Sequence, residues 1–428
     1  MILRSLTTAG FGVAAKVLGL VNQIASIALI SSTLGAEGLQ EQILAIAFVG
    51  WFNLTQWGMY TSLPVLLIRS SSRADSFATI VKTAFVIATV GCLCALGLTL
   101  LIIDRGWLGG PATTPIAMAA VCNAVTIVLG ISERIFQAID RIAQFNVLNM
   151  SGTLVSLAAT FFFSRTQGSA SDFVLAYYLS MMLPALIATS AILPRMKLTA
   201  RISLHDLVSS GRRLVGVGIF GYGYEIAAYC KIQAPLMLLS ALHLSNEIAP
   251  VGIGLRVVAL VSGSLSIVIP ILFLRVGQAS QLRDQEARRL WTYLGIACSI
   301  AVAIAIAGLF LLFGQPIYQT WTGGAVKLDQ SEQIALAAFS ALYLAQNLLY
   351  PLAAPHPAIA GKLRWMFWLE GLAVLAAGTG GALAVPTAYG GAGMLAGATL
   401  VLGLTVLVLL VFLAGSLKAE PSFDAKPS

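Results

Sequence analysis

Long runs of apolar residues constrain the fold of this chain more than any other feature of its sequence. An α-helix of about 20 apolar residues is long enough to cross a membrane core of about 30 Å. Of the 428 residues, 58% are hydrophobic and only 10% are charged, whereas soluble proteins carry about 25% charged residues. So few charges cannot cover a water-facing surface, and the sequence therefore predicts an all-α integral membrane protein.

The apolar runs predict about twelve transmembrane helices joined by short connections. We interpret the first as a retained span rather than a cleaved signal peptide, because it is long and contains Lys16. The predicted spans cover residues 7–32, 42–68, 80–103, 113–135, 146–164, 173–193, 211–241, 249–274, 290–313, 332–354, 364–385 and 391–415.

The lysines and arginines predict the orientation of these spans. With the N-terminus in the cytoplasm, 19 of the 25 fall on the cytoplasmic side. Only Arg105, Arg165 and Lys327 fall on the outer side. Because cytoplasmic loops are enriched in lysine and arginine, we expect both termini to be cytoplasmic. The net charge of +8 then reflects topology, and we expect no nucleic-acid partner.

The two halves of the chain indicate a tandem duplication. Residues 63–69 (LPVLLIR) and 269–275 (IPILFLR) lie 206 positions apart, at the ends of spans 2 and 8. The alternative is that proline, aliphatic residues and arginine are simply common at span ends. Six spans in each half give two six-helix lobes related as parallel repeats. The predicted parts are an N-terminal lobe at 1–194, a cytoplasmic linker at 195–210, a C-terminal lobe at 211–415 and a disordered cytoplasmic tail at 416–428.

Three cations lie inside predicted spans: Lys16 in span 1, Lys231 in span 7 and Arg256 in span 8. Each costs roughly 2.5–3.5 kcal/mol at a helix centre, so we expect them to face a water-filled interior or a partner. The alternative is that their long side chains reach the membrane surface. Lysine and arginine are the usual partners of phosphate. We therefore predict a cationic cavity that binds an anionic substrate.

Polar and small residues accompany these cations at helical spacing. Gly12, Lys16, Gly19, Gln23 and Ser26 form one such stripe along span 1, and spans 2 and 7 carry others. Since small residues also suit close helix packing, helix interfaces alone are the alternative explanation. The predicted polar lining of the cavity is Gln23, Asn53, Gln56, Tyr60 and Tyr224.

Glu225 is the one acid deep in span 7. It is six residues from Lys231, so the two side chains point to different faces of the helix. Glu225 either pairs with Lys16 or Arg256 across the cavity, or takes up a proton or binds Na⁺ during transport. We interpret Glu133 and Arg134, at the end of span 4, as interfacial.

Motifs for cofactors, metals and catalysis are missing from the sequence. The cysteines and histidines have no metal-ligand spacing, so we expect no metal and no cofactor. Residues 216–221 match G-x-G-x-x-G, but no strand precedes them, and we attribute the glycines to close helix packing. No Walker A, H-E-x-x-H or G-x-S-x-G sequence occurs, so we expect no enzyme.

Two short stretches resemble motifs of the MOP exporter superfamily, in its polysaccharide-biosynthesis branch of O-antigen (Wzx-type) flippases. Leu34-Gly35-Ala36-Glu37-Gly38 resembles that family's L-G-x-x-x-(F/Y)-G turn between spans 1 and 2, without its aromatic residue. Gln56-Trp57-Gly58 sits where the family often has D-x-G, with Gln56 in place of the acid. Lipid II flippases of this superfamily place basic residues in spans 1 and 8, which Lys16 and Arg256 match by position.

The resemblance implies a V-shaped, alternating-access transporter of a bacterial inner membrane. Its cargo would be a polyprenyl-diphosphate-linked oligosaccharide such as an O-antigen or exopolysaccharide unit. Its partners would be this anionic lipid-linked oligosaccharide, membrane lipids, a proton or Na⁺, and polysaccharide polymerase or chain-length proteins. The alternative on the same fold is an ion-coupled exporter of drugs or small metabolites, which usually has an interior rich in acids. A membrane enzyme would generally have a large outer loop or clustered catalytic residues.

Overall fold

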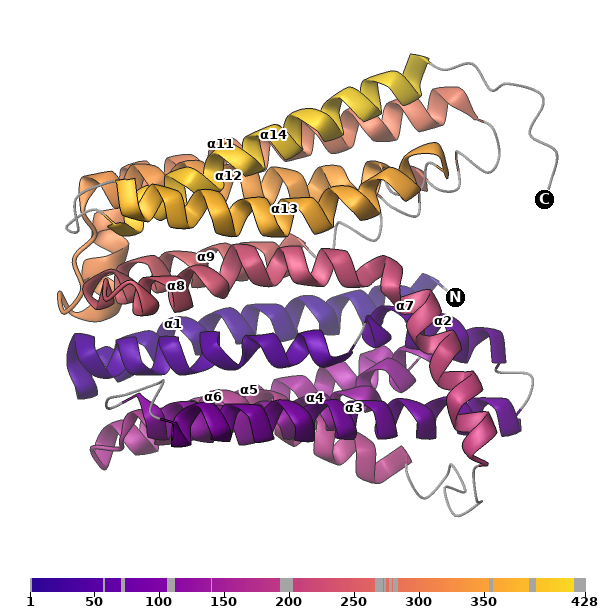
Figure 1. Cartoon of the computed structure of the whole chain (residues 1–428), viewed down its shortest axis with the longest axis horizontal. Helices are drawn as coiled ribbons and strands as arrows, with labels where there is room; N and C mark the ends of the chain where they lie inside the picture. Colours follow the sequence, from indigo (N-terminus) through magenta and orange to yellow (C-terminus); the bar gives the residue numbers. More distant parts are fainter. Residues whose placement is uncertain are drawn as a thin grey trace. The chain divides into compact units, whose positions relative to one another are not determined.

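Helices make up almost all of the chain that the computed structural model describes (Figure 1). Two compact units result, one formed by Met1–Gly254 and Gly314–Asp329, the other by Leu255–Phe313 and Gln330–Ser428. The predicted lobe boundaries stay a prediction, and residues 195–202 of the linker and 419–428 of the tail lie outside the described residues. The structure describes residues 2–56, 58–70, 74–105, 112–139, 141–192, 203–265, 272, 275–276, 279, 284–353, 357–384 and 390–418.

Helix α1 (Ile2–Val49) contains the first predicted span and the beginning of the second. Gly35 interrupts it with φ 70° and ψ −164°, and the chain reverses direction there (Figure 1). A positive φ is a conformation that glycine adopts without steric cost. The turn predicted at Leu34–Gly38 is therefore confirmed, and Gly35 is the residue that makes it.

The described parts of the remaining predicted spans also fall on helices. Among the described residues, nine segments are long and apolar enough to cross a membrane, and one of them, Gly10–Gln56, holds parts of two predicted spans. The elements that follow α1 are η1 (Gly50–Gln56), α2 (Met59–Ser70), α3 (Ala74–Asp104), α4 (Thr113–Ala138), α5 (Ile142–Arg165), α6 (Ala170–Ile192), α7 (Leu204–Ile232), α8 (Ala234–Ala241), η3 (Ser245–Glu247), α9 (Ile248–Leu265), α11 (Gln285–Thr322), α12 (Gln330–Ala353), α13 (Pro357–Ala384) and α14 (Gly390–Lys418).

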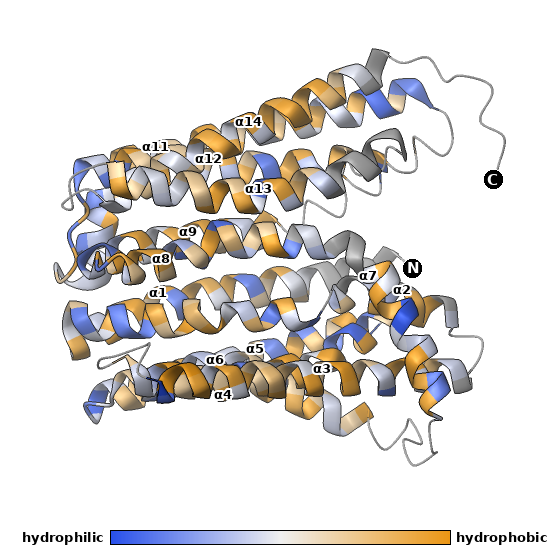
Figure 2. Cartoon of the chain, viewed as in Figure 1, coloured by the Kyte–Doolittle hydropathy of each residue, from blue (hydrophilic) through white to orange (hydrophobic). Residues whose placement is uncertain are grey.

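The outward faces of these helices are apolar. Leu312 of α11 and Leu400 of α14 are 72% and 71% exposed, and Phe162 of α5 is 60% exposed. Hydrophobic residues run along α3, α11 and α14 in Figure 2. Water would not tolerate this much exposed apolar surface, whereas lipid does. The chain is a multi-pass membrane protein, as predicted.

Polar side chains join the helices of the first unit. In the contact between α1 and α5, the Asn22 amide donates to the Ser156 hydroxyl at 3.2 Å. Further along the same two helices, the hydroxyls of Thr33 and Ser164 lie 2.9 Å apart. Hydrogen bonds of this kind stabilise helix pairs in lipid, where the hydrophobic effect does not drive helices together.

Glycines bring α13 and α14 together in the second unit. A Cβ at Gly381 would lie 2.1 Å from the carbonyl oxygen of Gly393, and a Cβ at Gly397 would lie 2.0 Å from that of Ala377. The two backbones are thus in direct contact, which only residues without a side chain allow.

Two predicted spans are broken within the first unit. Span 2 changes from α1 to η1 and resumes as α2 after Gly58, which has φ 69°. Span 7 is interrupted at Gln233, between α7 and α8, and Pro235 follows in the first turn of α8. Irregular backbone at membrane depth is tolerated where it is buried in protein or lines a cavity. Both breaks therefore point to the interior of this unit.

Candidate functional site

A polar cavity of about 490 Å³ lies inside the first unit beside the broken span 2. Its walls come from α1, η1, α2, α4, α5 and α6, together with Gln233 from the break in span 7. Gln23, Asn53 and Tyr60, three of the five residues predicted to form the polar lining, are among its walls. The other polar lining residues are Asn123, Thr126, Glu133, Asn149, Thr153, Tyr177, Tyr178, Ser180 and Gln233.

Local hydrogen bonds hold the broken backbone at this cavity. Where α1 tightens into η1, the carbonyl of Val49 accepts a hydrogen bond from the Asn123 amide of α4 at 2.9 Å. Within η1, the Asn53 amide donates to the Gly50 carbonyl at 3.2 Å. Side-chain amides thus supply hydrogen bonds to backbone carbonyls at the point where the regular α-helical hydrogen bonds end. Gln56 is buried and donates to the Asn53 side chain at 3.3 Å, a position behind the lining rather than in it.

Tyr60 connects the cavity to a group of charged residues. Its hydroxyl donates to the Ile127 carbonyl of α4 at 2.7 Å. The guanidinium carbon of Arg134 lies 5.0 Å from the centre of the Tyr60 ring, a cation–π distance. Arg134 Nη1 also lies 3.7 Å from Glu133 Oε1 and donates to Gln137 Oε1 at 3.1 Å. Arg134 therefore lies over the Tyr60 ring and is also held by contacts with Glu133 and Gln137.

Glu225 of α7 completes this group. Its carboxylate lies near Arg134 and accepts a hydrogen bond from the backbone N–H of Gly58. The backbone at Gly58 lies very close to α7, since a Cβ added at Gly58 would lie only 2.0 Å from the Gly218 carbonyl oxygen. The carbonyl in this contact belongs to Gly218 of the 216–221 motif, whereas a Cβ at Gly216 would meet no described atom within 4 Å. The packing role of the motif glycines stays a prediction. We name Tyr60, Glu133, Arg134, Gln137 and Glu225 the α2–α4–α7 cluster.

The three predicted cations have different surroundings. Lys231, in the last turn of α7, is 1% exposed, so its side chain is enclosed by protein. Lys16, on α1, is exposed. Arg256 is half-buried and belongs to the second unit. The shared cationic cavity stays a prediction, and the side chain of Tyr224 lies outside the described residues.

Sequence reasoning missed the role of Arg134. Arg134 and Glu133 lie close to the end of α4, and charges at a span end suggest the membrane surface. The described charged neighbour of Glu225 is Arg134 rather than Lys16. The available signal was Tyr60, an aromatic residue in a polar stripe of span 2, because arginine often stacks on such a ring.

The second unit has a buried polar group of its own. Glu370 of α13 is 3% exposed and accepts a hydrogen bond from the Gln346 amide of α12 at 2.6 Å. Beside Gln346, the Asn347 amide donates to the Ser262 hydroxyl of α9 at 3.0 Å. Glu370 lies within the predicted span 364–385, and its hydrogen-bond partner, Gln346, lies on another helix. In the described part of the chain, no group of three or more histidine, cysteine, aspartate or glutamate residues could hold a metal ion.

Comparison with known proteins identifies the fold. No family model matches the chain, and no curated protein matches it. A multidrug resistance MATE family transporter of the MOP superfamily, solved in an inward-facing conformation, is 15% identical with a TM-score of 0.72, covering 97% of this chain and 100% of that one. An outward-facing MATE structure is 13% identical with a TM-score of 0.66, covering 97% and 96%.

A third structure differs in the character of its pocket. It is a MOP superfamily transporter from Pyrococcus furiosus, described by a reverse polarity of its binding pocket that suggests a different function. It is 12% identical with a TM-score of 0.67, covering 97% of this chain and 96% of that one. The chain thus has the two-lobed fold of MATE transporters of the MOP superfamily, and the polysaccharide branch stays a prediction.

Proposed function

We propose that this protein moves a polyprenyl-diphosphate-linked oligosaccharide across a bacterial inner membrane by alternating access. The fold supports the transport part of this proposal, because transporters with the same fold have been solved facing inward and facing outward. Alternating access requires a binding site that two lobes expose in turn. The nature of the cargo has to come from the side chains.

The observation that carries the proposal is the burial of Lys231. An ammonium group that is 1% exposed loses its hydration, which costs several kcal/mol even after relaxation. Membrane proteins retain such groups where a partner group compensates the cost or where they lie on an ion or substrate pathway, and the proposal takes the second role for Lys231. In the proposed mechanism, Lys231 attracts the diphosphate of the cargo, and Lys16 and Arg256 contribute further positive charge.

The cavity of the first unit supplies chemistry suited to sugars. Its described lining is dominated by amides and hydroxyls, including Asn123, Asn149 and Tyr177, and contains one acid, Glu133. Amides and hydroxyls both donate and accept hydrogen bonds, as sugar hydroxyls do. A volume of about 490 Å³ lies within the range of small-molecule sites. We assign this cavity to the sugars, while the polyprenyl chain stays in lipid.

An ion-coupled exporter of drugs or small metabolites is the second candidate. Two observations favour it. Glu133 lines the cavity with Glu225 close behind, and a multidrug resistance transporter shares the fold. Such a protein would use these acids to bind cationic drugs or the coupling proton or Na⁺. The charge of the cargo, negative for the lipid-linked sugar and positive for such a drug, therefore distinguishes the two functions.

A substitution that removes only the ammonium group tests the proposal. In a bacterium that depends on this gene for surface polysaccharide, Lys231→Gln should lower polysaccharide by about tenfold or more, because a charge-assisted hydrogen bond contributes about 1.5–3 kcal/mol. Lys231→Arg keeps the charge and should restore part of the activity. Lys327→Gln makes the same change at an exposed loop lysine and should have no effect.

Protein levels decide how the result is interpreted. Membrane content of each variant is measured by immunoblot, and only variants present at wild-type level are compared. Normal polysaccharide in Lys231→Gln would contradict the proposed cargo. Loss of ethidium efflux in the same cells, with polysaccharide unchanged, would favour the drug exporter.

A further inference from the structure

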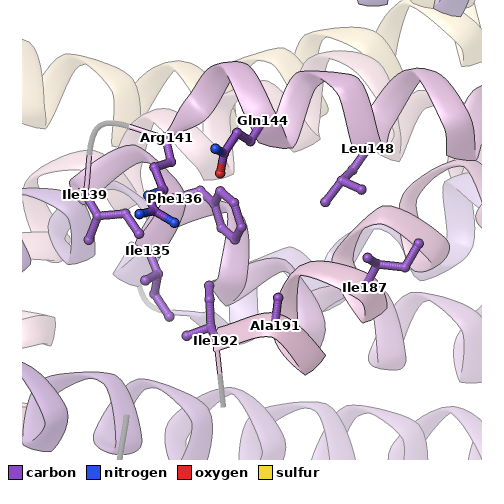
Figure 3. Close-up of a pocket in the computed structure, with 9 residues that line it drawn as sticks. All are labelled: Ile135, Phe136, Ile139, Arg141, Gln144, Leu148, Ile187, Ala191 and Ile192. Carbon is purple, nitrogen blue, oxygen red and sulfur yellow. The ribbon is translucent and has the colours of Figure 1, made fainter. Parts of the chain in front are cut away.

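A second pocket of the first unit lies where α4 and α6 end and α5 begins (Figure 3). It has a volume of about 530 Å³ and shares no lining residue with the polar cavity. Two of its lining residues, Arg141 and Gln144, are polar, and the rest are apolar. The apolar lining residues are Ile135, Phe136, Ile139, Leu148, Ile187, Ala191 and Ile192.

The pocket is placed at the level where a membrane meets water. Helix α4 ends at Ala138 and α5 starts at Ile142, so Arg141 lies in the connection between two spans. Leu148 lies six residues into α5, roughly 9 Å deeper at 1.5 Å per residue. The pocket therefore extends from the depth of lipid headgroups to the depth of the first acyl carbons, on the side that we predict to be cytoplasmic.

The polar residues make the upper part of the pocket suited to an anion. Arg141 points its guanidinium toward Ile135 and Phe136, and the Gln144 amide points to the same region (Figure 3). A guanidinium binds phosphate oxygens through two parallel hydrogen bonds. Arg141 also occupies the N-cap of α5, a helix with no acidic residue in its first turn. The positive end of the α5 dipole therefore also favours a negatively charged group at this place.

The apolar wall restricts what else can bind. A free phosphate would leave the surface from Phe136 to Ile192 unfilled. A peptide segment would bring backbone N–H and C=O groups against side chains that cannot hydrogen-bond to them. A zwitterionic lipid would bring an ammonium group, and none of the nine described lining residues is acidic. An acyl chain joined to a singly or doubly negative headgroup satisfies both parts of the pocket.

We propose that this pocket binds one anionic phospholipid of the surrounding leaflet. Its phosphate lies at the Arg141 guanidinium and the Gln144 amide, and one acyl chain packs between Phe136, Leu148 and Ile187. Basic pockets between transmembrane helices bind anionic headgroups in this way. The site is independent of the cargo that the transporter carries.

The test compares two lipids on the purified full-length protein. Thermal unfolding is followed in detergent micelles supplemented with phosphatidylglycerol or with phosphatidylcholine of the same acyl chains. Wild-type protein should be stabilised more by phosphatidylglycerol, with at least about tenfold tighter apparent binding, as expected for a charge-assisted contact of about 1.4 kcal/mol or more. Equal stabilisation by the two lipids would overturn the proposal without any variant.

Substitutions then assign the effect to this pocket. Arg141→Gln should remove the preference for phosphatidylglycerol, and Ala191→Trp should weaken the binding of both lipids by filling the pocket. Arg165→Gln, at an exposed arginine at the other end of α5, should leave the preference unchanged. Retention of the preference in Arg141→Gln would overturn the proposal. So would full protection by inorganic phosphate, or tighter binding of an undecaprenyl phosphate than of phosphatidylglycerol.

Discussion

Gly58 is the position where one added methyl group should have the largest effect on this structure. It lies at the break in span 2, has φ 69°, and its backbone N–H donates to Glu225. In Gly58→Ala, the new Cβ would lie 2.0 Å from the Gly218 carbonyl oxygen, whereas ordinary contact begins at 3.4 Å. Helices α2 and α7 would have to separate by about 1.4 Å, which would also draw the Gly58 N–H away from Glu225.

The expected cost has two parts. Holding an L-residue in the left-handed conformation costs about 1–2 kcal/mol, and overpacking a tight contact costs typically about 1–3 kcal/mol. Gly58→Ala should therefore lower the free energy of unfolding by about 2–5 kcal/mol. Transport should fall as well, because the α2–α4–α7 cluster loses its contact with the broken span.

Thermal unfolding of the purified protein, followed by tryptophan fluorescence, measures the stability part. The matched control is Gly216→Ala on α7, where no described atom lies within 4 Å of the new Cβ. An alanine there gains up to about 1 kcal/mol of helix propensity, so its Tm should equal or exceed that of the wild type. If Gly58→Ala unfolds at the same temperature as Gly216→Ala, the close α2–α7 contact at Gly58 is wrong.

Three further substitutions test other parts of the structure. Gly381→Ala should push α14 away from α13 and lower the free energy of unfolding by about 1–3 kcal/mol, and the Tm with it. Gly380 faces open space, so Gly380→Ala should not lower the Tm, and equal Tm values for the two variants would contradict the packing. Asn123→Leu leaves the Val49 carbonyl without its hydrogen bond and should cost about 1–3 kcal/mol in thermal unfolding; an unchanged Tm would remove the role given to Asn123. Glu225→Gln keeps an oxygen for the Gly58 N–H but removes the charge near Arg134, so transport should fall by about tenfold with folding retained; transport within twofold of the wild type would exclude a functional carboxylate there.

The membrane class and the helices could be predicted because each depends on residues adjacent in sequence. Runs of apolar residues specify a span without reference to any other part of the chain. Gly35 could be placed in a turn because residues 34–38 resemble a turn motif of the MOP exporter superfamily, and this motif too is local in sequence. The break in span 2 was not predicted, since nothing in residues 42–68 themselves marks it and the Val49 carbonyl before η1 is held by the Asn123 amide from α4.

The candidate site was predicted only in part because it depends on which helices meet. Gln23, Asn53 and Tyr60 share a cavity, as their polar stripes indicated. Arg134 was not assigned to the neighbouring cluster, because a charge close to the end of α4 suggests the membrane surface, whereas its contact with the Tyr60 ring depends on how α2 packs against α4. Lys16 and Lys231 have the same chemistry in sequence but opposite exposure in the structure, which packing alone decides.

Flipping of a defined cargo in proteoliposomes tests the central claim most directly. Purified protein is reconstituted with a fluorescent undecaprenyl-diphosphate oligosaccharide, and outward movement is measured by quenching from outside the vesicles. We expect flipping by the wild type and by Lys327→Gln, and at least about tenfold slower flipping by Lys231→Gln. Equal rates for Lys231→Gln and the wild type would contradict the account, as would wild-type transport of a cationic drug without any movement of the lipid-linked sugar.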